Sequence, residues 1–206
     1  MDTTFLITVF ATLFVVIDPI GLTTVFIALT QGTSVAHRRS VAIRACLVAA
    51  AILTLFAFLG ENVLGFIGIS MPAFRISGGI LLFLTALDML FERRTKRRED
   101  RADEEEFPDP SVFPIAIPLL AGPGSIATMI LLAGQANGAA EMAGILAIMV
   151  GVLVIGLVFF LLAGSIERAL GRTGIVVTTR LLGMLLAALS VQFVLDGLRD
   201  FGIGLS

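Results

Sequence analysis

The sequence has no tryptophan or tyrosine, and it has one cysteine and one histidine among 206 residues. Cys46 alone cannot form a disulfide within the chain, and with His37 it is too little for a His/Cys metal site. There is no HExxH motif, no Ser/His pair and no GxxxxGKS or GxxxxGKT phosphate-binding loop. These absences argue against a thiol or metal-dependent enzyme and against an ATP-driven pump on this chain, and nothing calls for a cofactor.

Hydrophobic residues, in contrast, are abundant. They make up 57% of the chain, and mean hydropathy is +1.03, which is typical of a polytopic membrane protein. The formal net charge of −2 gives no reason to expect nucleic-acid binding. The N-terminus lacks the basic region and cleavage site of a secretory signal. We therefore expect the first apolar run to remain as a membrane helix in contact with the lipid bilayer.

About 20 apolar residues are needed for a helix to cross the hydrocarbon core. The sequence predicts an all-α membrane protein with six transmembrane helices. These spans are expected at residues 3–30, 41–61, 71–91, 111–135, 142–165 and 177–197.

The basic residues predict the orientation of these spans. Three arginines follow the first span, six basic residues follow the third, and three arginines lie around the connection between the fifth and sixth. Of the 14 basic residues, only Arg75 and Arg199 fall on the opposite side. The positive-inside rule makes the crowded side cytoplasmic, so both termini are expected on the outer side.

Residues 92–110, ERRTKRREDRADEEEFPDP, form a basic block followed by an acidic block. This charged cytoplasmic linker is expected to be a solvated connector, or alternatively to touch anionic headgroups with its basic half. It separates two predicted units of three helices each, 1–91 and 111–206.

The two units resemble each other at an offset of 104 or 105 residues. The matching pairs are Pro19 with Pro123, Thr24 with Thr128, Arg75 with Arg180, and Gly78 with Gly183. Because each unit has three spans, the second enters the membrane from the opposite side. This predicts an inverted repeat, an arrangement common in secondary transporters.

Each unit carries a helix breaker inside its first span. "DPIG" at 18–21 and "AGPGS" at 121–125 are predicted to interrupt helices 1 and 4 at mid-membrane. Asp18 is expected to cap the half-helix that follows, with Pro19 at its first position. Two such helix starts facing each other would expose amide N–H groups to a small anion.

Hydroxyl and small side chains follow both breaks on single helix faces. An ionisable residue deep in a bilayer is costly, so Asp18 is a candidate to hold a substrate ammonium, a coupling cation or a proton, or else only to cap. Packing or bonding to the preceding turn explains Thr24 and Thr128 equally well. Gln192 is deep enough in its span to face the bundle, but an interhelical hydrogen bond explains it equally well. The candidate substrate-binding residues are Asp18, Pro19, Gly21, Thr23, Thr24, Gly122, Pro123, Gly124, Ser125, Thr128 and Gln192.

Four stretches resemble the MarC family of six-helix bacterial inner-membrane proteins: DPIGLTTVFIAL, LLAGPGSIATMI, RISGGILLFL and RLLGMLLAALSVQFVLDG. The resemblance implies a relation to LysE-type exporters, and some members are described as transporters of small neutral amino acids, especially glycine and alanine. By position it points to the residues of the two breaks. Many members have Asn-x-Pro after the first glycine, where this chain has Leu22, Thr23 and Thr24, and relatives can carry Asn at position 18. These departures imply a substrate preference that varies within the family.

The sequence therefore predicts a secondary transporter or exporter of a small polar solute, for which a proton or sodium ion is the candidate coupling ion. The family resemblance implies small neutral amino acids such as glycine or alanine as the solute. A metal-ion or other small-ion exporter, and a structural or regulatory membrane subunit without transport, remain open. The direction of transport and the oligomeric state are not predicted.

Overall fold

The computed structural model describes residues 3–91 and 110–202, which form helices joined by short connections and contain no strands. Five helices are long and apolar enough to cross a membrane, and the number is six if the bent pair of helices, Ser111–Leu120 and Pro123–Ala133, forms one span. The membrane class and the helical fold predicted from hydropathy are confirmed. The charged linker, apart from its last position, Pro110, and the final four residues lie outside the described residues, so the expectations for them stay predictions.

The first half contains α1 (Thr3–Ile17), α2 (Pro19–Leu29), α3 (Val35–Ile67) and α4 (Met71–Leu90). Together α1 and α2 form one apolar stretch of 27 residues, interrupted at Asp18. Helix α3 is longer at both ends than its apolar run. Ser34 caps its start by accepting the His37 N–H at 3.2 Å, and Gly68 ends it in the left-handed conformation at φ 82°.

The second half contains η1 (Ser111–Leu120), α6 (Pro123–Ala133), α7 (Ala139–Leu161) and α8 (Ala163–Asp200). Segment η1 is irregular, with extended backbone at Phe113 and Ile117, and its axis makes an angle of 55° with α6. Helix α8 is kinked at Gly171, where φ is 63° and ψ is 169°. Its apolar part, Thr173–Asp200, is 28 residues long.

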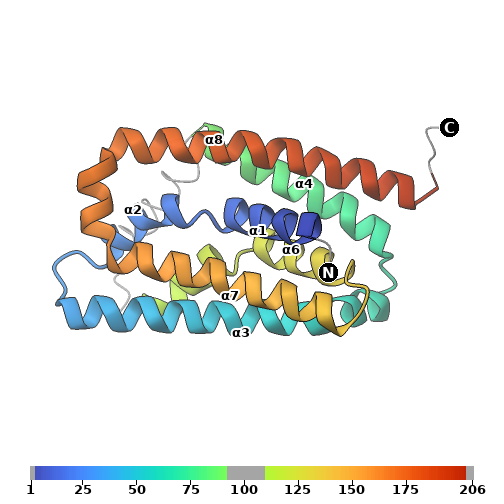
Figure 1. Cartoon of the computed structure of the whole chain (residues 1–206), viewed down its shortest axis with the longest axis horizontal. Helices are drawn as coiled ribbons and strands as arrows, with labels where there is room; N and C mark the ends of the chain where they lie inside the picture. The colour runs from blue at the N-terminus through green and yellow to red at the C-terminus, as the bar shows by residue number, and fades with distance from the viewer. Residues whose placement is uncertain (1–2, 92–109, 203–206) are drawn as a thin grey trace.

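The broken helices occupy the middle of the bundle. In Figure 1, α1, α2 and α6 lie between α4 and α8 on one side and α3 and α7 on the other, and the packing contacts agree. Burial follows the same order, since 56% of the apolar window in Thr3–Leu29 is buried against 28% in α4. The outer helices instead expose large apolar side chains such as Leu47, Phe58 and Leu185, as expected for contact with lipid.

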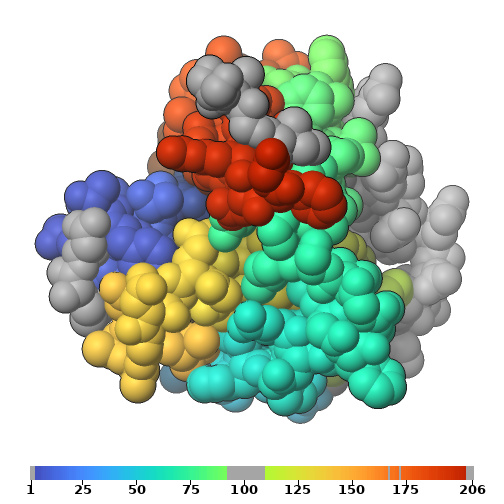
Figure 2. All heavy atoms as spheres, turned by 90° about the vertical axis from the view of Figure 1, so that its right-hand side faces the viewer, coloured from blue at the N-terminus to red at the C-terminus, as the bar shows by residue number. Residues whose placement is uncertain are grey.

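Glycines bring α4 and α8 close together. A Cβ on Gly79 would lie 2.8 Å from the Ser190 carbonyl oxygen, and one on Gly197 would lie 3.0 Å from the Pro72 carbonyl oxygen. The two helices are therefore in backbone contact and antiparallel. Figure 2 shows the bundle end at which α8 finishes, with α1 and the α6–α7 connection on one flank.

Candidate functional site

Asp18 lies between α1 and α2, directly after the last residue of α1, and caps the start of α2. Its N–H donates to the Phe14 carbonyl at 3.0 Å, and its carbonyl accepts the Leu22 N–H at 3.0 Å. Its backbone lies in the left-handed region, with φ 53° and ψ 61°. Aspartate and asparagine tolerate this conformation better than other side chains do. The break between α1 and α2 is thus a single residue wide.

The Asp18 carboxylate turns back over the start of α2. It accepts the Gly21 N–H at 3.1 Å, and Asp18 is only 1% exposed. A Cβ on Gly21 would lie 2.2 Å from Asp18 Oδ2, so a glycine is required beneath the carboxylate. Pro19 is buried at the first position of α2 and has no N–H for the Val15 carbonyl, four residues earlier.

The start of α6 is built differently. Gly122 has extended backbone, with φ −83° and ψ 171°, and its carbonyl accepts the Ile126 N–H at 2.9 Å. No side chain caps this helix. A Cβ on Gly122 would lie 2.3 Å from the Pro118 carbonyl oxygen, so this glycine is required by close backbone approach. Gly122 and Ser125 are buried, whereas Pro123 is exposed.

The structure brings the starts of α2 and α6 into the same region of the bundle. The Cβ position of Gly124 lies 3.6 Å from Val16 Cγ1, two residues before Asp18, and 3.4 Å from Leu82 Cδ2 of α4. Helix α1 begins at the end of the bundle where α6 finishes, so the two run antiparallel (Figure 1). Pro19 lies against α7, with its Cβ 3.9 Å from the Cβ position of Gly156.

The predicted hydroxyls fall into two groups. Thr23 donates to the Pro19 carbonyl at 3.0 Å, and Thr24 donates to the Gly21 carbonyl at 2.9 Å, so both bond to the preceding turn of α2. Thr128 is fully buried in α6, and its hydroxyl has no hydrogen-bond partner. An unsatisfied buried hydroxyl costs about 1–3 kcal/mol. Thr128 is therefore the threonine in this region that retains hydrogen-bonding capacity for a ligand.

Thr12 is a further candidate that the sequence reasoning missed. It is fully buried in α1, and its hydroxyl also lacks a partner. Thr12 lies four residues before Val16, and Thr128 lies four residues after Gly124. Because the helices are antiparallel and rise 1.5 Å per residue, both hydroxyls lie at the same level, about 6 Å from the Val16–Gly124 contact. The available signal was a lone hydroxyl in the apolar stretch FATLF, six residues before the break.

Gln192 does not belong to this cluster. It is exposed on α8, and its Nε2 donates to Asp196 Oδ1 of the same helix at 2.8 Å. The buried face of α8 carries Phe193 and Gly197 instead, because glycine allows the close approach to α4. We expected Gln192 to face the bundle. Its side chain is instead exposed, and it pairs with Asp196 of its own helix.

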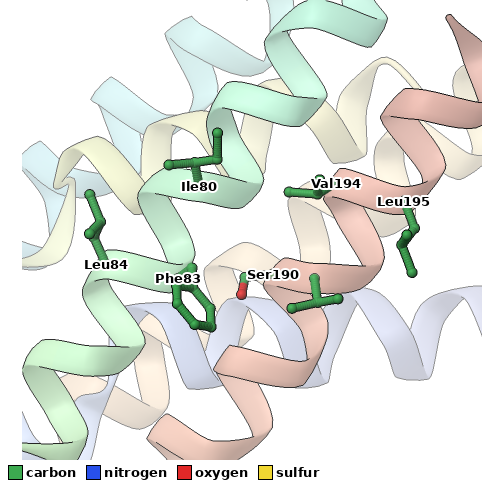
Figure 3. A pocket seen from close by; sticks show the side chains of 7 residues that line it. Ile80, Phe83, Leu84, Ser190, Val194 and Leu195 are labelled. Atoms are coloured by element: carbon green, nitrogen blue, oxygen red, sulfur yellow. The ribbon is translucent and has the colours of Figure 1, made fainter. Parts of the chain in front are cut away.

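A hollow between α4 and α8 lies apart from the breaks. Its volume is about 240 Å³, and its lining side chains are apolar except for Ser190 (Figure 3). The Ser190 hydroxyl donates to the Ala187 carbonyl at 2.7 Å, so it is already satisfied. This hollow suits an apolar chain and not a polar solute. Elsewhere in the part of the chain that the structure describes, no three His, Cys, Asp or Glu side chains are grouped to hold a metal ion.

Comparison with known proteins agrees with this architecture. The family described as "MarC family integral membrane protein" matches residues 3–201. A UPF0056 membrane protein of Methanocaldococcus jannaschii is 40% identical over 205 residues, covering 97% of this chain and 98% of its own. YvbG of Bacillus subtilis and YhcE of Escherichia coli, both called UPF0056 membrane proteins, are each 32% identical over 199 residues. They cover 95% of this chain, and 94% and 93% of their own lengths. No solved structure matches at a significant level. The relatives' names identify membrane proteins and state no enzymatic activity.

Proposed function

This chain belongs to the MarC family of integral membrane proteins, and from that premise we propose that it is a secondary transporter of a small zwitterionic solute. Glycine and alanine are the first candidates, as the family resemblance implies. The solute binds between the start of α2 and the start of α6. It contacts residues 18–21 in the first half and residues 122–125 and Thr128 in the second.

The observation that carries this proposal is the difference between the two helix starts. Asp18 places a buried carboxylate at the start of α2, whereas α6 starts after the buried Gly122 and has no side-chain cap. A carboxylate attracts an ammonium group, and uncapped N–H groups at a helix start attract a carboxylate. A zwitterionic amino acid carries both charges a short distance apart. Thr128 then supplies a hydrogen bond from the same face of α6.

The two halves act in this proposal as inverted repeats, 1–91 and 111–206, with their first spans broken at mid-membrane. Their packing partners correspond, which supports the repeat. Helix α2 packs on α7 and α8, and α6 packs on their counterparts α3 and α4. Helices α4 and α8 pack on each other, as do α3 and α7. Exchanging the halves preserves all of these contacts.

Transport requires the site to open, because it is closed in this structure. Asp18, Ser125 and Thr128 are at most 2% exposed. We assign this conformation to an occluded state, from which one half rocks against the other to open either side. The protein acts in the cell membrane, which is the inner membrane in a bacterium, and the uneven distribution of basic residues favours an orientation with both termini outside.

A small cation is the second candidate cargo, or the coupling ion. Asp18 contributes a hard anionic oxygen, and Pro19 gives no N–H to the Val15 carbonyl, which points toward the same break. Sodium or a proton at this position would couple to the solute through Asp18. A regulatory subunit without transport is the competing interpretation, and it predicts no flux.

Counterflow of labelled glycine and alanine in proteoliposomes tests the proposal. The wild-type protein should exchange both solutes, with competition by other small neutral amino acids. Asp18→Asn keeps the cap and removes the charge, so exchange should fall at least about tenfold or change its pH dependence. Thr8→Val, on an exposed turn of α1, serves as a control with unchanged exchange. If folded wild-type protein exchanges neither solute under sodium or proton gradients, the amino acid assignment is wrong.

A further inference from the structure

A second hollow, distinct from the transport site, lies at one end of the bundle. It is formed where α3 begins and where α7 passes into α8, at the left-hand end of Figure 1. Its volume is about 280 Å³. The lining residues are Val35, Arg38, Arg39, Phe160, Leu161, Leu162, Gly164, Ser165 and Arg168.

Three arginines line this hollow, and none of its described lining residues is acidic. Arg38 and Arg39 lie in the second turn of α3, and Arg168 lies near the start of α8. Neither helix has an acidic side chain in its first turn. The positive ends of two helix dipoles and three guanidinium groups are therefore gathered at one place, which is unfavourable unless an anion binds there.

Two of the arginines, Arg38 and Arg168, are held in place by neighbouring groups. The Arg38 guanidinium lies over the Phe26 ring, 5.8 Å from its centroid. Phe26 stacks on Phe160 with centroids 4.6 Å apart and planes at 10°, and both rings are 1% exposed. Arg168 Nε donates to the Gly164 carbonyl at 2.9 Å, which orients its guanidinium along the edge of the hollow. Ser165, beside it, adds a hydroxyl.

The rim of the hollow is apolar and exposed. Val35 is 83% exposed, and Leu161 and Leu162 are 48% and 51% exposed. In an integral membrane protein, such side chains at the end of a helix bundle face lipid. The hollow thus combines three guanidinium groups for a phosphate with exposed apolar side chains for acyl chains.

From this combination we infer that the hollow binds the phosphate headgroup of an anionic phospholipid from the adjacent leaflet. Basic pockets between transmembrane helices are suited to this ligand class. Arginine suits phosphate because its planar fork donates two parallel hydrogen bonds. The apolar rim distinguishes a lipid from a soluble phosphate, which gains nothing from Val35 or Leu162. The inference does not depend on the proposed transport activity.

Native mass spectrometry of the full-length protein tests this assignment by counting bound lipids. The protein, in a neutral detergent, is titrated with phosphatidylglycerol or with phosphatidylcholine. The wild type should retain phosphatidylglycerol selectively. The variant R38Q/R39Q/R168Q should lose about tenfold or more in apparent affinity, since each basic residue near a charged surface contributes about fivefold. A matched triple change in the linker, R93Q/R94Q/R97Q, removes the same charge and should leave affinity within about twofold.

Three results would overturn the inference. One is equal loss in both triple variants, which indicates diffuse charge attraction. Another is full displacement of the lipid by micromolar glycerol phosphate, which assigns the hollow to a soluble anion. The third is lipid binding that appears only in a variant in which Asp103, Glu104, Glu105 and Glu106 are neutralised. That result would assign the hollow to the acidic part of the linker as its occupant. Arg39→Gln alone, with helicity checked by circular dichroism, keeps the test valid if the triple variant misfolds.

Discussion

At the scale of single residues, the break between α1 and α2 depends on a matched pair. Asp18 adopts a left-handed conformation and folds its carboxylate onto α2, and Gly21 leaves room for it. The sequence predicted Asp18 as a cap and Pro19 as the first helical residue, and both positions are found. The left-handed backbone was not predictable, because the D-P-x-G pattern also suits the usual extended cap.

The pairing of Asp18 with Gly21 can be tested by a double-mutant cycle. Gly21→Ala alone places a Cβ against the carboxylate and should destabilise the protein by about 1–3 kcal/mol. In an Asp18→Gly background the carboxylate is absent and the left-handed backbone remains easy, so the same change should cost much less. Thermal unfolding followed by circular dichroism measures both costs. Equal costs in the two backgrounds would show that the crowding lies elsewhere.

A substitution at Thr128 distinguishes a ligand-binding role of its hydroxyl from a packing role. Thr128→Val keeps the shape and removes a hydroxyl that has no partner, so stability should be unchanged or rise by about 1 kcal/mol. If the hydroxyl binds the solute, the apparent affinity in counterflow should nonetheless fall about tenfold.

Thr23→Val is the matched control for this prediction, because Thr23 is equally buried but bonds to the Pro19 carbonyl. It should leave solute affinity unchanged. The ligand role of Thr128 is rejected if both variants have wild-type affinity, or if both lose it equally.

At the scale of helices, the positions of the spans followed from hydropathy, while their ends and contacts did not. Helix α3 extends well beyond its predicted apolar run of 41–61, because Ser34 and Gly68 set its ends and arginines are tolerated where a helix leaves the membrane. The irregular η1 segment was expected as part of one span. Pro114 and Pro118 predict an irregular helix at this place. They do not predict the angle between the axes of η1 and α6, because η1 also packs against α3.

The glycine contact between α4 and α8 gives a prediction at this scale. Gly79→Ala places a Cβ 2.8 Å from a backbone oxygen of α8, which cannot rotate away, so the variant should lose about 1–3 kcal/mol of stability. Gly151→Ala in α7 meets no atom within 4 Å and should be neutral or stabilising. Thermal midpoints in detergent compare the two. Comparable midpoints would mean that α4 and α8 separate readily.

At the scale of the whole molecule, the sequence indicated which segments form the site but not how they meet. The offset between the halves pointed to both breaks, and the structure places the start of α6 against the end of α1. Thr12 was missed because it has no counterpart in the repeat, and α1 is buried by α6, α7 and α8, which are more than 100 residues away in sequence. Gln192 was misplaced because hydropathy gives depth in a membrane and not the face of a helix.

Cysteine labelling tests the orientation of the molecule in the membrane, and the chain is well suited to this method. Its single cysteine, Cys46, is buried, so the wild-type protein should give little background with a membrane-impermeant maleimide. Gln31→Cys lies in the exposed α2–α3 connection and should be labelled only after cells are permeabilised. Ala139→Cys is exposed at the start of α7 and should be labelled in intact cells.

The opposite labelling pattern would place the arginine-rich end outside and contradict the positive-inside assignment. It would also move the proposed phospholipid site to the outer leaflet. Labelling of both sites in intact cells would contradict a six-span topology altogether.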